Sequence, residues 1–206
     1  MARFFLNAAL LPLACGVLAG PALAQGAELG GELVPGICLL SRDAVFANAK
    51  VGRAGFARYQ QLEGEADAEL ARMREPIDAD FQSLQASAAT LSPQQRAEKE
   101  AAVRAKAQPV QARAAHLRRE LDATRAKLLE RLSGEMQPSI AAIYKLKGCG
   151  LLIARESVFG GNLGNDMTAD VVRALDARIQ TISFNREMLP SVLNAETPPL
   201  PESSQP

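Results

Sequence analysis

Two long runs of apolar residues spaced three and four positions apart occupy the middle of the chain. The first run extends from Leu62 to Ala88 and the second from Val103 to Leu132. This spacing places one apolar stripe on each of two helices. Ala, Leu, Glu, Arg, Lys and Gln dominate both runs, and all six favour helix. The pattern predicts a long antiparallel helical hairpin over residues 57–147.

A short break separates the two runs and predicts the tip of the hairpin. Its sequence is Thr90-Leu91-Ser92-Pro93. Ser92 can cap the second helix, Pro93 suits the first helical position, and Gln95 can complete a capping box. The second helix is therefore expected to begin at this point.

Charge is distributed unequally between the two predicted helices, although the whole chain has 23 basic and 23 acidic residues. Residues 56–90 hold three basic and seven acidic residues, whereas residues 94–147 hold twelve basic and six acidic ones. Each exposed ion pair contributes only about 0 to 1 kcal/mol, so the charges indicate orientation more than stability. They favour pairing of the two helices within one chain.

Pro76 and Pro109 lie inside the two predicted helices. An interior proline removes a backbone hydrogen bond and bends the helix. In an antiparallel hairpin, two residues equally far from the tip in sequence lie at the same level. Pro76 and Pro109 are equally far from a tip between Ser92 and Pro93, so they are expected at the same level. The favoured interpretation is a hinge partway along the hairpin, and the alternative is a modest shared bend without a functional role.

Short apolar segments flank the hairpin and predict a small sheet. Ile37–Leu40 and Leu151–Ala154 are expected to be buried strands, and Ser157–Phe159 is a candidate third strand. Two or three short strands are marginally stable by themselves. Several copies of the chain are therefore expected to join their strands into one closed body.

Two capping residues predict further helices beside these strands. Ser41 is expected to cap a helical turn that runs through Phe46. Thr168 is expected to cap a final helix from Ala169 to about Thr181, with Val171, Val172, Leu175 and Ile179 on its apolar face. A Pro-rich stretch beyond this helix predicts disorder.

The N-terminal segment is typical of a secretory signal peptide. Arg3 is followed by a short apolar stretch, and Ala22-Leu23-Ala24 predicts cleavage between Ala24 and Gln25. The predicted organisation is a signal peptide (1–24), a flexible leader (25–36), a β body with the final helix (37–56 and 148–184), a hairpin arm (57–147) and a disordered tail (185–206).

Cys38 and Cys149 remain after removal of the signal peptide, and an exported chain meets an oxidising compartment. A disulfide between them would close a loop of about 110 residues and stabilise the fold by about 4 to 5 kcal/mol. Two free buried thiols are the alternative, because the sequence does not say whether the two Cβ atoms face each other.

The sequence offers no arrangement of residues suited to catalysis, metal binding or cofactor binding. His116 is the single histidine, and no Ser/His/Asp or Cys/His set has workable spacing. Gly148-Cys149-Gly150 precedes a strand, so it is interpreted as a helix stop. The acids Glu63, Glu65, Asp67 and Glu69 are interpreted as a solvated helix face. The chain is predicted to be neither an enzyme nor a nucleic-acid-binding protein, with no metal and no cofactor.

The order of these elements resembles the Skp/OmpH family of periplasmic chaperones over about residues 37–179. Asp166-Met167-Thr168-Ala169-Asp170-Val171, which opens the final helix, and the strand before it are the most specific features. The resemblance implies an α+β homotrimer, in which shared strands form a small β-barrel body and three hairpins enclose a cavity. It also implies an ATP-independent periplasmic holdase that binds unfolded outer-membrane proteins.

Two other functions remain open from the sequence. A periplasmic coiled-coil structural or adaptor protein would bind a folded partner, through the tip or the tail. A lipid anchor on Cys15 would instead make the chain an envelope spacer. The positive charge of the second helix additionally leaves weak contact with an anionic membrane surface as a prediction.

Overall fold

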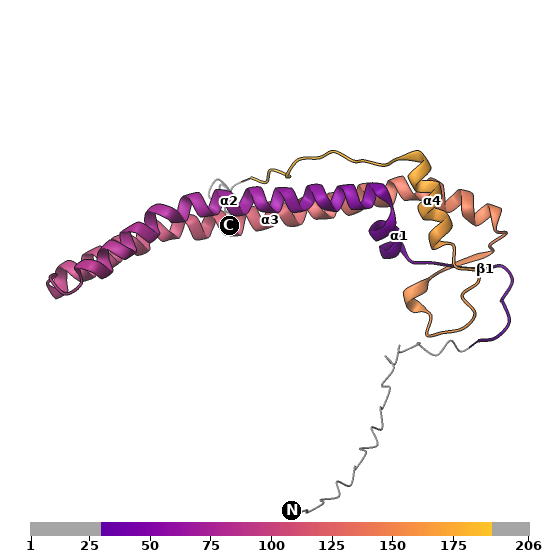
Figure 1. Cartoon of the computed structure of the whole chain (residues 1–206), viewed down its shortest axis with the longest axis horizontal. Helices are drawn as coiled ribbons and strands as arrows, with labels where there is room; N and C mark the ends of the chain where they lie inside the picture. The colour runs from indigo at the N-terminus through magenta and orange to yellow at the C-terminus, as the bar shows by residue number, and fades with distance from the viewer. Residues whose placement is uncertain (1–29, 191–206) are drawn as a thin grey trace, which may run out of the picture.

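The computed structural model describes residues 30–190. The elements in chain order are β1 (Ile37–Leu40), α1 (Arg42–Asn48), α2 (Lys50–Ser87), α3 (Pro93–Leu146), β2 (Leu151–Ala154), the 3-10 helix η1 (Arg155–Ser157) and α4 (Thr168–Arg178). Figure 1 shows α2 and α3 as a long hairpin that projects from a small body formed by the other elements. The predicted signal peptide, its cleavage site, Cys15 and residues 191–206 lie outside the described residues.

The hairpin begins earlier than the sequence predicts. α2 starts at Lys50 and includes Gly52 and Gly55, two glycines that precede the predicted start at residue 57. A Cβ at Gly52 would collide with the Phe46 carbonyl oxygen, and one at Gly55 would lie 2.9 Å from Leu128 Cδ1. The two glycines therefore allow α2 to pass close to neighbouring elements without interrupting the helix.

The tip of the hairpin has the predicted capping box. The Ser92 hydroxyl accepts a hydrogen bond from Gln95 N at 3.2 Å, and Gln95 Oε1 accepts one from Ser92 N at 3.0 Å. Pro93 is the first residue of α3, where its missing N–H costs nothing. This prediction is confirmed in full.

Ion pairs cross the hairpin in the direction that its charge distribution favours. Arg113 Nε of α3 lies 2.6 Å from a Glu69 carboxylate oxygen of α2, and Lys106 of α3 pairs with Asp80 of α2. The acidic partner belongs to α2 and the basic partner to α3 in both pairs. Antiparallel pairing within one chain is thus confirmed.

The hydrophobic core lies where α1, α4 and β1 meet the root of the hairpin. β1 contributes Cys38 and Leu40 to this core. The largest fully buried side chains of the core come from the helices and the residue before α4: Val45, Val51, Leu128, Leu132, Met136, Met167, Val171 and Leu175. Burying one such side chain stabilises the fold by roughly 1.5 to 3 kcal/mol. Toward the tip the stripe is less buried, with Leu84 and Val110 its last buried members.

β1 and β2 form a two-stranded parallel sheet, with Ile37 opposite Leu151 and Leu40 opposite Ala154. The other edge of β1 contacts the segment before α4, because Leu39 N donates to Asn165 O at 3.1 Å. The third strand predicted at residues 157–159 is wrong. η1 includes Ser157, and residues 158–159 form no strand. The Ser41 hydroxyl donates to the Glu156 carboxylate, which holds the chain in a turn directly after β2.

α4 begins one residue earlier and ends three residues earlier than the sequence predicts. Its N-cap position is occupied by Met167, and the Asp166 carboxylate accepts a hydrogen bond from Thr168 N at 2.8 Å. The Thr168 hydroxyl instead accepts from Ser41 N at 2.9 Å, which joins α4 to the end of β1. The predicted cap at Thr168 is therefore replaced by a tertiary contact.

Residues 179–190 follow α4 and run back along the hairpin in an extended conformation (Figure 1). We call this segment the strap. The sequence predicts disorder from residue 185, but the described part of that region, residues 185–190, contacts α2 and α3. The difference arises because the strap has no helical periodicity, and its partners are supplied by the distant hairpin.

Candidate functional site

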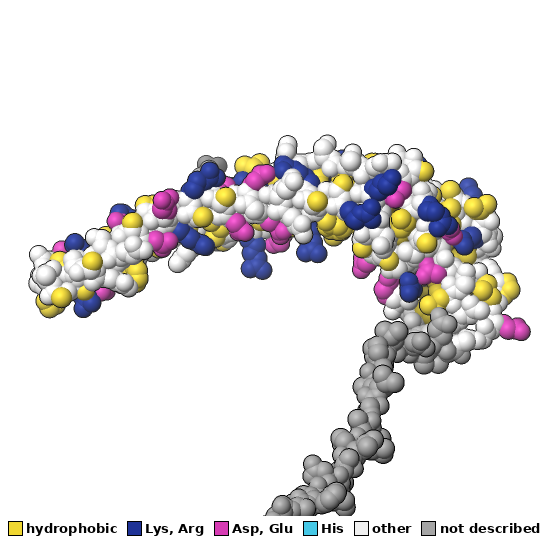
Figure 2. Space-filling view, viewed as in Figure 1, with side chains coloured by type: hydrophobic (Ala, Val, Ile, Leu, Met, Phe, Trp, Pro, Cys, Tyr) yellow, Lys and Arg dark blue, Asp and Glu magenta, His cyan; other side chains and the backbone are white. Residues whose placement is uncertain are grey.

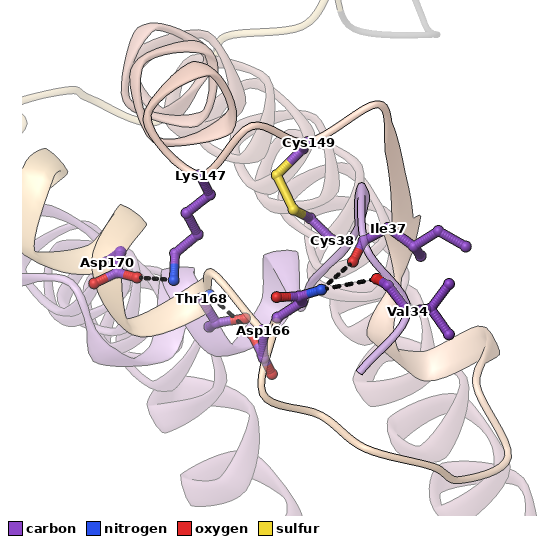
Figure 3. The surroundings of a disulfide bond; sticks show 9 residues. Val34, Ile37, Cys38, Lys147, Cys149, Asp166, Thr168 and Asp170 are labelled. Carbon is purple, nitrogen blue, oxygen red and sulfur yellow. Dashed lines mark hydrogen bonds and ion pairs between the residues drawn. A yellow bond between two sulfur atoms is a disulfide. The ribbon is translucent and has the colours of Figure 1, made fainter. Parts of the chain in front are cut away.

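The root of the hairpin is joined to the sheet by a disulfide between Cys38 and Cys149 (Figure 3). The two Cα atoms are 5.7 Å apart, within the range that a disulfide requires. Cys38 belongs to β1, and Cys149 follows the positive-φ Gly148 that ends α3. Nearby, Lys147 Nζ lies 2.8 Å from an Asp170 carboxylate oxygen, an ion pair that ties the same end of α3 to α4.

The outer edge of β2 has no strand partner within residues 30–190. β2 is also less buried than the sequence predicts, since Leu151 is 53% exposed. Phe159 and Leu146 are further exposed apolar side chains of the body. Figure 2 shows hydrophobic side chains on the surface of the body and, along the hairpin, among charged ones. An open strand edge bordered by apolar side chains can accept another strand.

One face of the sheet borders a hollow of about 360 Å³. Its apolar lining combines both strands with the loops around them: Val34, Ile37, Leu39, Ile153, Val158 and Leu163. The opposite face packs on the core through Cys38, Leu40 and Leu152. The sheet therefore has one filled face and one hollow apolar face.

A second hollow of about 390 Å³ lies between α2 and α3 near the tip. Phe81, Leu84 and Val103 supply its apolar part, and Phe81 is 51% exposed. Glu100 lies on its rim and pairs with arginines one turn before and after it on α3. This distal groove presents apolar surface within a charged border.

The strap covers the proximal half of the hairpin. Side chains of α2 and α3 form hydrogen bonds with the main chain of the strap. Arg58 Nε of α2 donates to Phe184 O at 3.4 Å, and Arg131 Nη1 of α3 donates to Ser183 O at 3.0 Å. Glu187 N in turn donates to the Thr124 hydroxyl at 2.9 Å. Helix side chains thus replace the partners that a neighbouring strand would supply.

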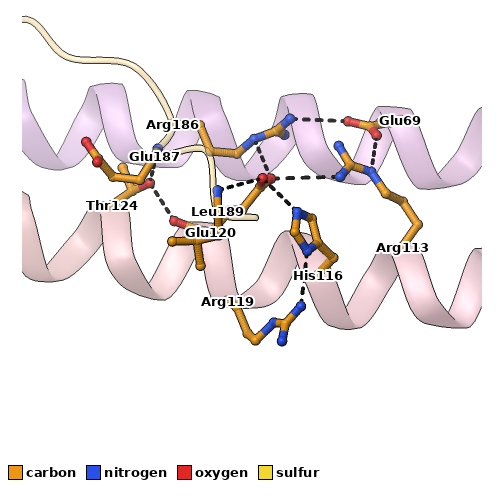
Figure 4. Close-up of polar contacts among 9 residues, drawn as sticks. All are labelled: Glu69, Arg113, His116, Arg119, Glu120, Thr124, Arg186, Glu187 and Leu189. Atoms are coloured by element: carbon orange, nitrogen blue, oxygen red, sulfur yellow. Dashed lines mark hydrogen bonds and ion pairs between the residues drawn. The ribbon is translucent and has the colours of Figure 1, made fainter. Parts of the chain in front are cut away.

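A cluster of charged side chains surrounds the fully buried Glu120 of α3 (Figure 4). His116 Nε2 lies 3.0 Å from Glu120 Oε1, which also accepts from Leu189 N at 3.3 Å. Arg186 Nε of the strap lies 3.2 Å from Glu120 Oε2, in ion-pair range but without hydrogen-bond alignment. Arg113 is 4.0 Å from the same oxygen. The cluster therefore joins the strap to α3.

Glu69 extends this cluster to α2, contrary to its interpretation as part of a solvated face. Its carboxylate accepts from Arg113 Nε at 2.6 Å and from Arg186 Nη2 at 3.5 Å. The hydrogen bond from Arg113 is the main reason that the pKa of Glu69 is lowered, and it outweighs the effect of burial. Arg186 thus bridges one carboxylate on each helix.

Pro76 and Pro109 lie inside continuous helices and are exposed. The ion pair between Asp80 and Lys106 supports placing the two prolines at about the same level of the hairpin. Both lie just beyond the level of Glu69 and Arg113, where the contacts of the strap end. The hairpin curves along its length (Figure 1), and the hinge remains a prediction.

The described part of the chain contains no group of three or more His, Cys, Asp or Glu side chains able to hold a metal ion. Among residues 30–190, no helix combines the length and apolarity needed to cross a membrane. The remaining candidates for function are therefore surfaces: the β2 edge, the distal groove and the groove under the strap.

Sequence reasoning missed Glu120, although a signal was present. Glu120 occupies the helical stripe that also contains Leu117, Thr124 and Leu128, all of which are buried. A charged residue within an apolar stripe requires a partner if it is buried. The partner, Arg186, could not be found because it lies in a segment outside the helices, 66 residues further along the chain.

A long helical hairpin on a small α/β body defines a class of elongated proteins. The candidate functional sites of this chain are exposed surfaces that could bind other polypeptides. The model of the family described as "Outer membrane protein (OmpH-like)" matches residues 36–175, so the chain belongs to the OmpH-like family. This match confirms the family resemblance found in the sequence. A comparison with curated proteins found no match.

The chain is also similar to the crystal structure of a proposed outer membrane chaperone (OmpH-like) from Caulobacter crescentus. The two are 33% identical with a TM-score of 0.67, and the match covers 80% of this chain and 96% of the other. Family and neighbour together support a chaperone role, and the family is not one of enzymes.

Proposed function

We propose that the chain is an ATP-independent holdase of the periplasm that binds unfolded outer-membrane proteins. Residues 1–24 would direct its export and be removed before Gln25. The observation that carries the proposal is the separation of two apolar surfaces, one on the body and one far along the hairpin. The first would serve assembly and the second would contact the client.

Assembly into a trimer would complete the body. The β2 edge lacks a partner within the described chain, and the adjoining sheet face borders an apolar hollow. Strands from three copies could pair at these edges and close a small barrel around the three hollow faces. Three hairpins would then project from one body and enclose a cavity.

Client binding would use many weak contacts instead of one specific pocket. Phe81, Leu84 and Val103 offer apolar surface to an unfolded chain, and the arginines around Glu100 offer charge. Enclosure between hairpins would keep the unpaired strands of one client from meeting those of another. Because each contact is weak, the client could leave without nucleotide hydrolysis.

An aggregation assay with purified mature protein tests this proposal. A denatured β-barrel membrane protein is diluted into buffer with increasing chaperone, and turbidity is followed while light scattering reports the oligomeric state. Suppression near one trimer per client is expected. A stable monomer would contradict the trimer, and undiminished aggregation together with tight binding of a folded partner would favour the adaptor function.

A further inference from the structure

We propose that the proximal hairpin carries a binding site for an extended polypeptide, and that the strap is its internal occupant. The site is the surface of α2 and α3 that the strap contacts, and we call this surface the groove. Its ligand would be an extended segment with alternating apolar side chains followed by a basic one. The identification of this ligand as an unfolded outer-membrane protein rests on the proposed holdase function.

The groove binds main-chain atoms, which suits a ligand of variable sequence. Two carbonyl oxygens of the strap accept from the arginines of α2 and α3, and two strap N–H groups donate to Thr124 and Glu120. The strap forms no backbone–backbone hydrogen bond with the described residues after Ile179. Its extended form is therefore imposed by the groove and does not come from a sheet.

Alternate side chains of the strap point toward the hairpin. Ile182 and Phe184 pack on the hydrophobic core, whereas Ser183 between them and Asn185 after them are exposed. Space for Ile182 depends on Gly55, because a Cβ at that position would lie 3.2 Å from Ile182 Cγ2. A period of two is also the pattern of strands in a membrane β-barrel, whose apolar and polar residues alternate.

A pocket for a basic side chain follows the apolar positions. Arg186 is held between Glu69 of α2 and Glu120 of α3, and its side chain is only 17% exposed. Arg113 and His116 also face this pocket from α3. The two carboxylates outnumber the one fixed guanidinium, so the arginine of the ligand balances the remaining negative charge. The pocket would fix the register of an otherwise loosely specified segment.

The strap is tied to the fold in a way that permits exchange. α4 anchors it at one end, and beyond Arg186 the exposed Met188 marks its outer part. An anchored segment has a high effective concentration, typically millimolar, so the strap would exclude weak ligands. An extended client that contacts the chaperone at many sites at once would displace it. Release of the strap would uncover the groove without unfolding a helix or strand.

A labelled peptide identical to residues 180–190 (QTISFNREMLP) provides a direct probe of the groove. Its binding to the full mature protein is measured by fluorescence anisotropy for the wild type, Arg186→Ala and the control Asn185→Ala, which alters an exposed strap residue. Arg186→Ala weakens the internal occupant and leaves Glu69 and Glu120 in place, so the peptide can supply the missing arginine. We expect at least about tenfold tighter binding to Arg186→Ala than to the other two proteins.

A second peptide with glutamate in place of its arginine should lose this binding, because it would place a third carboxylate beside Glu69 and Glu120. Arg131→Ala provides an independent variant that removes one contact to the strap main chain and leaves the charged pocket intact. It should also bind the original peptide more tightly than wild type does. Circular dichroism establishes that each variant keeps its helix content.

Displacement of the bound peptide by a denatured β-barrel protein tests the identity of the ligand. Equal peptide binding by wild type and both strap-weakened variants, or binding by none of them, would overturn the inference. Suppressed aggregation without displacement would also reject this site and leave the holdase function standing. Peptide binding by a protein that fails to suppress aggregation would reject the holdase function and retain the groove.

Discussion

At the scale of single residues, the most consequential group is Glu120. It is the only charged side chain that is buried among residues 30–190. A buried carboxylate is costly unless it is paired, and its two arginine partners come from two segments, Arg113 from α3 and Arg186 from the strap. Glu120 therefore makes the strap a source of partners for a buried charge of α3.

Replacing Glu120 by alanine should destabilise the fold because it leaves Arg186 and Arg113 without their buried partner. We expect a loss of about 3 kcal/mol in the free energy of unfolding, near the lower end for a broken buried ion pair because the arginines are partly exposed. Chemical denaturation measures this change. The matched control is Glu130→Ala, at an exposed position of the same helix, and an equal effect in both variants would contradict the pairing.

Glu69 predicts a pH dependence with a defined sign. The pKa of its carboxyl is lowered in the folded state, chiefly by the hydrogen bond from Arg113. Its stabilising effect is therefore present above the unfolded-state pKa and disappears as pH falls through the folded-state pKa. Glu69→Gln should be less stable than wild type at pH 7, and the difference should shrink as pH is lowered below about 4.5.

The control for this titration is Asp67→Asn, an exposed acid on the same helix that forms no ion pair within residues 30–190. Denaturation midpoints are compared for the three proteins across the acidic range. A Glu69→Gln effect that stays constant with pH would show that the substitution acts through packing and not through charge.

At the scale of elements, the two long helices differ in support along their length. The strap covers the proximal half, where most buried residues of the stripe lie, and the distal half beyond Glu69 and Arg113 depends on the two helices alone. Pro76 and Pro109 lie at the start of this less supported half. Bending is expected there because lost hydrogen bonds coincide with reduced packing.

Substituting both prolines by alanine should stiffen the hairpin, because each substitution restores a backbone N–H donor inside a helix. Hydrogen exchange measured by mass spectrometry should slow by about tenfold for peptides covering residues 70–80 and 103–113. Pro138→Ala is the matched control, since Pro138 also lies inside α3 but close to the body. Unchanged exchange in the double variant would argue against a hinge.

The disulfide links two elements that are separated by 111 residues in sequence. Replacing both Cys38 and Cys149 by serine should lower the free energy of unfolding by about 4 to 5 kcal/mol, because the unfolded chain regains the freedom of a long loop. Denaturation of the oxidised wild type and the variant gives this difference. Reduced wild type should resemble the variant, and identical stability of all three forms would contradict the prediction.

At the scale of the whole molecule, assembly and client binding should be separable. The exposed Phe159 belongs to the body, whereas the half-exposed Phe81 lies in the distal groove of the hairpin. Because the two surfaces lie far apart on an elongated molecule, a substitution in one is not expected to affect the other. Each surface therefore provides the control for the other.

Phe159→Glu should disrupt the trimer, because a charge would be buried where the bodies meet, whereas Phe81→Glu should leave the trimer intact. Phe81→Glu should instead weaken suppression of aggregation by several-fold, since it places a charge in the apolar part of the groove. Light scattering and the turbidity assay measure the two effects. A trimeric Phe159→Glu variant, or a monomeric Phe81→Glu variant, would contradict this assignment of surfaces.

The sequence by itself determined the local elements of this protein. The spacing of apolar residues defined both long helices, Ser92 and Gln95 defined the tip, and short apolar runs defined β1 and β2. These features depend on residues close together in the chain, so their patterns are visible without a fold. The family resemblance followed from their order.

Only the tertiary structure decided how distant segments meet. It brought Cys38 to Cys149, gave the β1 edge to residues 165–167 in place of a third strand, and placed Arg186 between Glu69 and Glu120. None of these contacts has a periodic signal, because each joins groups more than 50 residues apart in the sequence. Side chains of α2 and α3 hold the strap along the hairpin, and a local pattern cannot encode such partners.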